Sequence, residues 1–578
     1  MVLSFSSPLS RWCARLLPGA ILSCSLVFTI PSSGQIPAAS PTPIQTPLPT
    51  PDPGADPPAP IQPTFDIPLR PMPNGGRIGV SVDDQLPVTL AQAIELALGN
   101  NNDIDASRNT ARISDFGLSG ARGVYDPLLA AEGYYEKITI PTASLIGGAV
   151  NGAVTQTRFF GSTGVSGFSP YQGGSYSALF NSSRTTTSNT NSFLNPQFPS
   201  SLVLNYVQPL WRNRSIDNNR RTIEIAKKNL ELTDAQLRQR AIEVIAAVER
   251  AYWDLVFALR NHQVQLETLT QSREQLESNR RLVASGVLAP IEIVSATVQV
   301  TTFEQTVFNA QEAVTRAENT LKTLLLPDRR SPEWSRAFTP VTPVELDVPA
   351  IGLEVAITEA LKNRPEIDQL ETTAEINQID QRFYRNQTKP QIDLVGSYTA
   401  QGLAGTETPA AINPATGLSR VPPNLVGGYF SSLGNLAALD YPSYRVGLNI
   451  SLPWGNRVAK ANLGQSIVEG DRIANNLAQT EQVIEAEVRN AIQALRSAES
   501  RLASATDART AAEELYASEQ RLFRGGTSTF YLVSQRQTEL AVARFRELQA
   551  RTDLNKAISE FQRSIGSTLT ANNVTVAK

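Results

Sequence analysis

The chain has 578 residues and a formal net charge of -3, with acidic and basic residues interspersed along its predicted helices. A nucleic-acid-binding surface needs a concentrated basic tract, so we expect neither DNA nor RNA as a partner. Both cysteines, Cys13 and Cys24, lie within residues 1–34, so we expect neither disulfide bonds nor thiol chemistry in the remainder of the chain.

Residues 1–34 have the pattern of a secretory signal peptide. Arg11 and Arg15 precede the apolar segment LLPGAILSCSLVFTI, and small residues suited to cleavage follow it. A transmembrane anchor is the alternative, although the apolar stretch is shorter than the roughly 20 residues that a spanning helix needs. Lipidation of Cys24 is a second alternative, against which the apolar residues directly after it argue. No later stretch is long and apolar enough for a spanning helix, so strands would have to place this protein in a membrane.

A proline-rich segment follows at residues 35–80. It contains PAASPTPIQTPLPTPDPGADPPAPIQP, of which more than a third is proline. This composition favours an extended, semi-rigid linker without a core. A segment that binds the cell wall or a partner is the alternative.

The rest of the chain is predicted to be a duplicated fold. LAQAIELALGNNNDID, from Leu90, is matched by LEVAITEALKNRPEID, from Leu353. The match continues with VQPLWRNR beside SLPWGNR, and with RLVASG beside RLFRGG. Self-similarity in a fixed order indicates an internal repeat. The predicted segments are repeats at 81–330 and 351–569, a linker at 331–350 and a tail at 570–578.

Each repeat is predicted to contain a helix, a strand, a long loop, a strand, a very long helix, a tight turn and a long helix. The strands alternate apolar and polar residues over about ten positions, which is the length of a tilted bilayer-crossing strand. A small soluble sheet packed on helices is the alternative. Barrels start at about eight strands, so four membrane-spanning strands would need two or more copies of the chain to close. The predicted strands are at 128–138, 201–210, 391–400 and 444–453.

The long helices are predicted to pack in pairs as antiparallel coiled-coil hairpins. At 1.5 Å per residue the longest would extend on the order of 100 Å, far beyond a single globular core. Their polar faces are rich in Gln, Asn, Thr, Glu and Arg, and suit either outside solvent or a water-filled interior. The predicted helices are at 218–285, 291–326, 456–524 and 528–565.

These elements, duplicated in this order, resemble the TolC-like outer membrane efflux proteins. The resemblance is carried by the LxxAIxxAL helices from Leu90 and Leu353 and by the strand exits PLWRNR and LPWGNR. Two turns complete it, SGVLAPIEIVSATVQ at 285–299 and GGTSTFYLVSQRQTE at 525–539. The resemblance implies a mainly α fold with a membrane β-barrel.

The resemblance also implies a function. Three chains would each give four strands to one twelve-stranded barrel in the outer membrane, which an α-helical coiled-coil tunnel would continue through the periplasm. Such a homotrimer is a passive exit duct for efflux or type I secretion. It docks a periplasmic adaptor (a membrane fusion protein) and an inner-membrane pump, and outer membrane lipid surrounds its barrel.

The resemblance assigns roles to the two tight turns and to nearby side chains. Relatives contact the adaptor through these helix-turn-helix tips, and acidic residues just after the second tip narrow their tunnel entrance. Leu532 and Gln535 stand where those acids would fall, and Glu292 matches an acidic position near the entrance, so Glu292 and Gln535 are the candidate entrance ring. A threefold ring of Glu292 would repel itself and attract cations, whereas a solvated surface glutamate is the alternative. The tip residues are Gly286, Val287, Leu288, Gly526, Thr527 and Ser528.

Three aromatic residues are candidates for the membrane interface. Tyr444 and Trp454 mark the two ends of the last predicted strand, and Trp211 follows the second. Tyr and Trp are enriched where a membrane-spanning strand meets the headgroups.

No feature of the sequence predicts an enzyme. The single histidine, His262, lies in RNHQVQLE on a predicted helix without a Ser, Cys or metal-ligand cluster at a useful spacing, so a solvated helix face is expected. No phosphate-binding loop such as GxxxxGKS occurs, and we expect no catalytic residue, metal or cofactor. Two other interpretations stay open: a periplasmic or surface coiled-coil scaffold without a pore, and a soluble repeat-type binding protein. The cargo, whether drug, metal, protein or glycolipid, is left open too.

Overall fold

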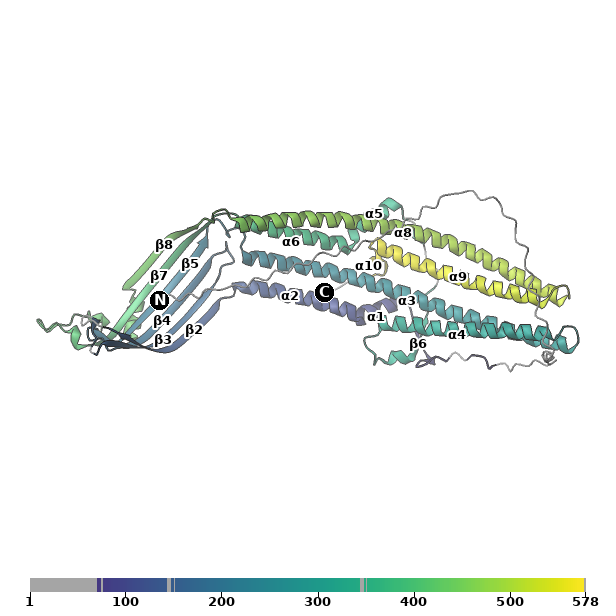
Figure 1. The fold of residues 1–578 in the computed structure, drawn as a ribbon, viewed down its shortest axis with the longest axis horizontal. Coiled ribbons are helices and arrows are strands. Elements are labelled where there is room, and N and C mark those ends of the chain that lie inside the picture. Colours follow the sequence, from purple (N-terminus) through teal and green to yellow (C-terminus); the bar gives the residue numbers. More distant parts are fainter. Residues whose placement is uncertain are drawn as a thin grey trace, which may run out of the picture. The chain divides into compact units, whose positions relative to one another are not determined.

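The computed structural model describes residues 70–73, 76–142, 147–149, 151–343, 348–349 and 351–575. The expected signal peptide and most of the expected proline-rich linker lie outside these residues. The described chain contains one six-stranded sheet, one two-stranded sheet and two pairs of long helices (Figure 1).

The large sheet is antiparallel throughout, in the order β2-β3-β4-β5-β7-β8. The prediction of four strands is wrong, because the segment expected to be a long loop between the first two strands folds into β3 and β4. Gly, Ser and Thr occupy so many positions of AVTQTRFFGSTGVSGF and SYSALFNSSRTTT that the alternation in hydropathy is weak there. The expected total of twelve strands rested on that count of four. The strands are β2 (Leu128–Pro141), β3 (Ala153–Phe168), β4 (Ser175–Thr187), β5 (Leu194–Pro209), β7 (Gln391–Glu407) and β8 (Tyr441–Ser451).

The sheet has two free edges within the described residues. β2 pairs only with β3, and β8 pairs only with β7, so each edge strand leaves one row of N–H and C=O groups without a strand partner. Nearly every residue of both strands is exposed. Such edges are not tolerated in lipid, because no water is present there to satisfy the backbone groups.

The long helices form two hairpins, α3 with α4 and α8 with α9. Their predicted ends differ from the observed ends by two residues or fewer. The side chain of Asp217 caps α3 by accepting a hydrogen bond of 2.8 Å from the backbone N of Arg220. The helices of the first repeat are α1 (Leu90–Asn100), α2 (Asn102–Arg122), α3 (Asn218–Ala284) and α4 (Ile291–Leu325). Those of the second are α5 (Leu353–Asn363), α6 (Pro365–Gln387), α8 (Arg457–Arg524) and α9 (Phe530–Ser564).

Each repeat has its own hydrophobic core around its first short helix. In the first repeat, α1 packs on α3 beside Tyr252 and Trp253, which are fully buried, and the Tyr252 hydroxyl donates to the carbonyl of Val88 at 3.0 Å. In the second, α5 packs on α8 beside Val488 and Phe561. The matched helices from Leu90 and Leu353 therefore each pack on the long helix of their own repeat and help to form its core.

A two-stranded parallel sheet, which the sequence analysis did not predict, joins β1 (Ser81–Val88) to β6 (Arg336–Pro340). It ties the segment before α1 to the segment after α4. The remaining elements are short: η1 (Gly123–Tyr125), η3 (Pro332–Ser335), η4 (Pro409–Ala411), η5 (Pro423–Leu425), α7 (Tyr429–Ala438) and α10 (Thr568–Ala571).

A buried cluster of charges holds α4 to β6. Glu318 and Lys322, one turn apart on α4, have fully buried side chains, and Lys322 Nζ lies 3.1 Å from Glu318 Oε1. Glu318 also pairs with Arg77 and accepts a 2.8 Å hydrogen bond from the backbone N of Phe338. Lys322 Nζ donates to the carbonyls of Trp334 and Arg336 at 2.9 and 2.7 Å. Burial is the main cause that lowers the pKa of Lys322, which the neighbouring Glu318 opposes.

Among the residues that the structure describes, no helix is both long enough and apolar enough to cross a membrane.

Candidate functional site

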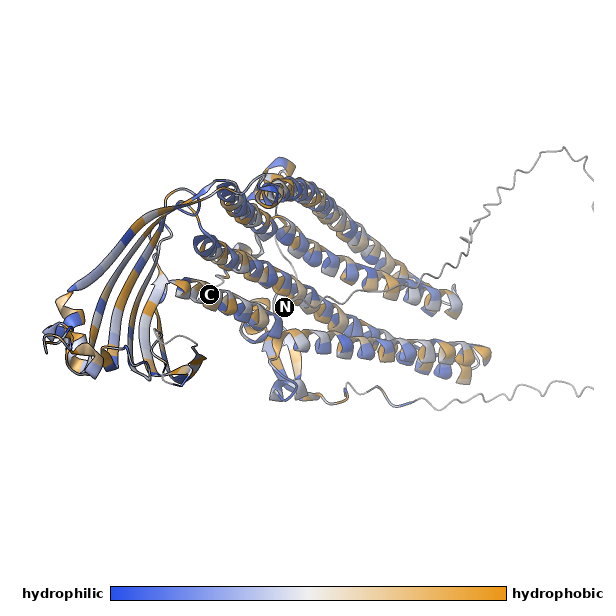
Figure 2. Ribbon diagram, turned by 60° about the vertical axis from the view of Figure 1, so that its left-hand side comes forward, coloured by the Kyte–Doolittle hydropathy of each residue, from blue (hydrophilic) through white to orange (hydrophobic). Residues whose placement is uncertain are grey.

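The large sheet has two chemically different faces. In an antiparallel sheet, residues that pair across neighbouring strands lie on the same face, so the strand register assigns every side chain to one side. Hydrophobic and hydrophilic residues are both present along each strand, as Figure 2 shows.

One face, called the apolar face, is hydrophobic over most of its length. One row of paired residues crosses all six strands on it: Ala131, Thr163, Phe180, Leu202, Ala400 and Pro442. Further members of this face by the same register are Leu129, Tyr135, Phe159, Leu204, Tyr206, Leu394, Tyr398, Tyr444, Val446, Leu448 and Ile450. Its two charged residues, Lys137 and Arg184, lie within four residues of the strand ends that lead into the β2–β3 and β4–β5 connections. A lipid-facing surface has this composition.

The other face, called the polar face, carries hydroxyl, amide and charged side chains. One row of paired residues crosses all six strands here too: Glu132, Ser162, Asn181, Ser201, Gln401 and Tyr441. Glu136, Arg158, Asn205, Thr399, Arg445 and Asn449 lie on the same face by register. A wall with one apolar and one polar face suits a barrel with lipid outside and water inside.

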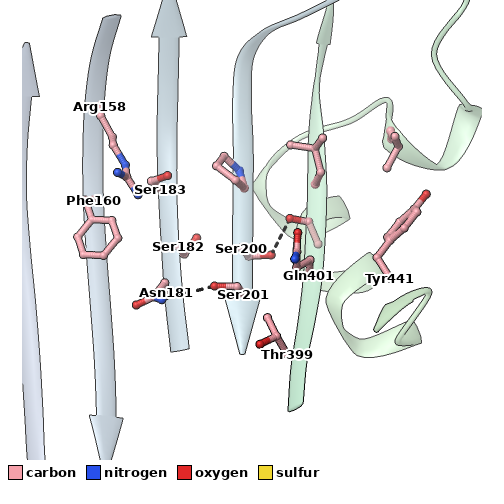
Figure 3. A pocket seen from close by; sticks show the side chains of 14 residues that line it. Arg158, Phe160, Asn181, Ser182, Ser183, Ser200, Ser201, Thr399, Gln401 and Tyr441 are labelled. Atoms are coloured by element: carbon pink, nitrogen blue, oxygen red, sulfur yellow. Dashed lines mark hydrogen bonds between the residues drawn. The ribbon is translucent and has the colours of Figure 1, made fainter. Parts of the chain in front are cut away.

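A groove with a volume of about 500 Å³ lies along the polar face (Figure 3). Arg158 lies with its guanidinium carbon 4.6 Å from the centre of the Phe160 ring, and it makes no ion pair within the described part of the chain. Asn181 Nδ2 lies 3.4 Å from Ser201 Oγ. Arg158 and Asn181 were not predicted as site residues, because their segment was expected to be a loop. A signal for the strand of Arg158 is the set of β-branched residues on one side of it, Thr155, Thr157, Thr163 and Val165.

All three predicted interface aromatics are exposed. Tyr444 lies on the apolar face, opposite Tyr398, and is 83% exposed. Trp211 and Trp454 follow the ends of β5 and β8, two strands that run in the same direction, so both lie at the end of the sheet that leads into the long helices. Their contact with a membrane interface stays a prediction.

The two helix-hairpin tips have the same backbone geometry. Gly286 and Gly526 both have φ of +75°, in the left-handed region that favours glycine. After α3, the backbone N of Val287 donates to the carbonyl of Leu282 at 2.9 Å, and that of Gly286 to Val283 at 3.0 Å. The same two bonds recur after α8, from Thr527 to Leu522 and from Gly526 to Phe523. Both helices therefore end in a Schellman motif, which explains why the repeat conserves glycine at this position in both halves.

The tips present apolar side chains to solvent. Val287 is 68% exposed and Ile291 57% exposed in the first tip, and Tyr531 is 73% exposed in the second. Exposed apolar residues grouped at one place are typical of a protein-binding surface. Their use in docking an adaptor stays a prediction.

A single chain supplies one Glu292 and one Gln535 to the candidate entrance ring. Glu292, in the first turn of α4, is half-buried, and Gln535 on α9 is exposed and donates to Glu539 Oε1 at 3.0 Å. The two hairpins touch near these residues, because Gln299 on α4 bonds to Ser534 and to Thr538 on α9. A ring of Glu292 needs further copies of the chain and stays a prediction.

His262 is half-buried on α3, which corrects the expectation of a solvated helix face. Burial lowers its pKa, and the positive charge of Arg77 lowers it further. Arg77 belongs to the segment before β1, and helical periodicity does not reveal an influence from a residue so far away in the sequence.

The sequence matches a known protein family, and the fold is similar to that of solved outer membrane channels. A family model described as outer membrane efflux protein matches residues 175–325 and 356–567. No curated protein matches the chain. The outer-membrane channel OprN has a similar structure, with a TM-score of 0.58 and 18% sequence identity over 83% of this chain and 90% of that chain. The Campylobacter jejuni outer membrane channel CmeC has a TM-score of 0.57 and 15% identity, over 87% of this chain and 94% of that chain. The Neisseria gonorrhoeae outer membrane channel MtrE, in its open state, has a TM-score of 0.55 and 16% identity, over 83% of this chain and 89% of that chain.

A two-faced sheet joined to long helical hairpins defines an outer membrane channel with a helical tunnel. Because the family model matches more than half of the residues, the chain belongs to the outer membrane efflux protein family. The predicted resemblance is thereby confirmed, and so is the predicted fold class of a mainly α, duplicated chain with a membrane β-barrel. The predicted location in the outer membrane is confirmed as well. The members of this family are channels rather than enzymes.

Proposed function

We propose that this protein is a homotrimeric exit duct, which docks a periplasmic adaptor and an inner-membrane pump and passively conducts small molecules or proteins to the exterior. The duct would serve efflux or type I secretion. The observation that carries the proposal is the open six-stranded sheet, apolar on one face and polar on the other, with an unpaired strand at each edge.

The edges support the assembly of several copies. β2 and β8 leave unpaired backbone groups that lipid cannot satisfy, and pairing β8 of one copy with β2 of the next would remove both edges. The polar face would then surround water, and the apolar face would meet the lipid tails.

The tips support docking of a partner at the far end of the helices. Val287, Ile291 and Tyr531 are exposed apolar side chains at or directly after two turns of the same backbone geometry. An adaptor with an apolar contact surface could cover both tips of one chain in the same way.

A coiled-coil scaffold without a pore is the competing function. A scaffold has no need of a sheet with one apolar and one polar face, and the continuous rows across all six strands therefore favour the duct.

The proposal is tested by recording single channels of the protein in a planar bilayer, with the oligomer mass measured on the same sample. We expect discrete cation-preferring conductance from a trimer. Glu292→Gln should weaken the cation preference, because it removes a charge near the tunnel entrance. The matched control is Glu312→Gln, on the same helix, whose exposed side chain pairs with Arg316 and should leave the preference unchanged. A water-soluble species that never conducts would reject the duct, and an unchanged preference in Glu292→Gln would remove Glu292 from the entrance.

A further inference from the structure

The two strands that the sequence analysis did not predict change the size of the barrel. β3 and β4 lie within the sheet, between β2 and β5, so they belong to the same continuous ladder as the predicted strands. We propose that the β3–β4 hairpin is a membrane-spanning part of the wall, and that three copies close an eighteen-stranded barrel with a wide water-filled lumen. This inference rests on the proposed trimeric duct.

The register of the hairpin supports its place in the wall. Every residue of β2 pairs with β3 without a bulge, from Leu128 with Ser166 to Pro141 with Ala153. β3 pairs with β4 in the same unbroken way, from Phe168 with Ser175 to Gln156 with Thr187. A flap outside the membrane has no reason to continue a ladder over the full length of its neighbours.

The side chains of the hairpin continue both faces of the sheet. Thr163 and Phe180 fill the apolar row between Ala131 and Leu202, and the Phe159 ring lies 4.8 Å from that of Tyr135 on the same face. On the polar row, Ser162 and Asn181 fill the places between Glu132 and Ser201. A shift of the pairing by one residue would move every side chain of a strand to the opposite face. The match of both hairpin strands to the apolar and polar rows of their neighbours therefore supports this register.

The number of strands in the closed barrel determines the diameter of the barrel. The diameter of a barrel grows roughly linearly with its number of strands, and barrels of about 16 to 18 strands leave an aqueous channel. Six strands in each of three copies make eighteen, against the twelve expected from four strands per chain. The barrel diameter would therefore be about 1.5 times that of a twelve-stranded barrel. The hairpin also adds Arg158 to the polar face, on the wall of the groove shown in Figure 3.

Cysteine labelling tests whether the hairpin is in the wall without altering the fold. The background is the chain with Cys13→Ser and Cys24→Ser, which has no other cysteine. In lipid vesicles, Ser162→Cys should react with a water-soluble, membrane-impermeant maleimide, whereas the adjacent Thr163→Cys should be protected by lipid. Asn449→Cys and Leu448→Cys on β8 are the matched reference pair for the polar and the apolar face.

The outcomes separate this inference from the proposed function. If β8 shows the contrast and β3 reacts equally at both positions, the hairpin lies outside the membrane and the eighteen-stranded barrel is rejected. If β8 shows no contrast either, the membrane-spanning sheet itself fails, and the proposed duct fails with it.

The width is tested by the size of polyethylene glycol that enters the barrel. Polymers added on the side of the barrel should lower the conductance up to a larger size in the natural protein than in a variant with residues 142–193 replaced by Asn-Gly. Equal size limits would reject the wider barrel, and so would an oligomer mass of two chains, since two copies of six strands close only twelve. If the deletion variant does not assemble, the labelling contrast in β3 and the mass of the natural oligomer still decide.

Discussion

Glu318 lies at the centre of the buried charge cluster between α4 and β6. Its carboxylate meets both Arg77 and Lys322, and all three side chains are buried. Removing one member of a buried ion cluster leaves the other charges uncompensated, at a cost of about 3 to 5 kcal/mol. We therefore expect Glu318→Ala to lower the thermal unfolding midpoint strongly, measured by circular dichroism in detergent.

A matched control for this prediction lies on the same helix. Glu312 pairs with Arg316 on the surface, where an ion pair contributes about 1 kcal/mol or less, so Glu312→Ala should leave the midpoint nearly unchanged. Equal shifts in the two variants would mean that the buried cluster has no special role.

Glu249 on α3 makes the stability of the protein depend on pH. Burial raises the pKa of Glu249, although a 3.0 Å hydrogen bond from Asn572 Nδ2 opposes the shift. The folded chain therefore keeps this proton to a higher pH than the unfolded chain does. The free energy of unfolding should fall as the pH rises from the ordinary value of 4.5 through the raised pKa.

The substitution Glu249→Gln should remove that part of the pH dependence. The measurement is the unfolding midpoint of both proteins at a series of pH values between about 4 and 7. Parallel curves for the natural protein and the variant would show that Glu249 does not carry the effect.

At the scale of elements, the two helical hairpins depend on one glycine each. Gly526 has φ of +75°, which an L residue adopts at a cost of about 1 kcal/mol, so Gly526→Ala should destabilise the second hairpin by about that amount. Gly464 lies inside α8, and an added Cβ there would meet no atom within 4 Å. Gly464→Ala should stabilise the same helix by about 1 kcal/mol.

The same change from glycine to alanine should therefore lower the unfolding midpoint at Gly526 and raise it at Gly464. A destabilisation of both variants, or of neither, would contradict the assignment of Gly526 as the residue that ends α8.

The helical hairpins could be predicted from the sequence because their signals are local. The repeated glycines Gly286 and Gly526 and the proline-free runs before them mark the helices and the turns directly. β3 and β4 could not be predicted in this way, because Gly, Ser and Thr on a water-facing wall give little contrast in hydropathy. Their position is determined by pairing with β2 and β5, and a pattern within the segment itself does not reveal such pairing.

The candidate site was predicted unevenly for the same reason. The tips and Glu292 lie beside recognisable turns, whereas Arg158 reaches the polar face only through the register of a strand that the sequence barely marks. Likewise, the contact of Arg77 with Glu318 joins residues 241 positions apart.

At the scale of the whole molecule, the central claim is that the sheet closes only by joining copies edge to edge. The proposed order places β8 of one copy beside β2 of the next, in a ring of three. In the chain with Cys13→Ser and Cys24→Ser, any disulfide bond must come from cysteines introduced at this contact, because the chain has no other cysteine.

The decisive measurement is therefore disulfide cross-linking between the two edge strands. Tyr134→Cys on β2 is combined in turn with a cysteine at Ser443, Arg445, Gly447 or Asn449 on β8, all of which lie on the polar face. We predict that oxidation links the chains of at least one of these variants into a covalent species of three chains, with nothing larger. Absence of a cross-link at every position, or closure at two chains, would contradict the account.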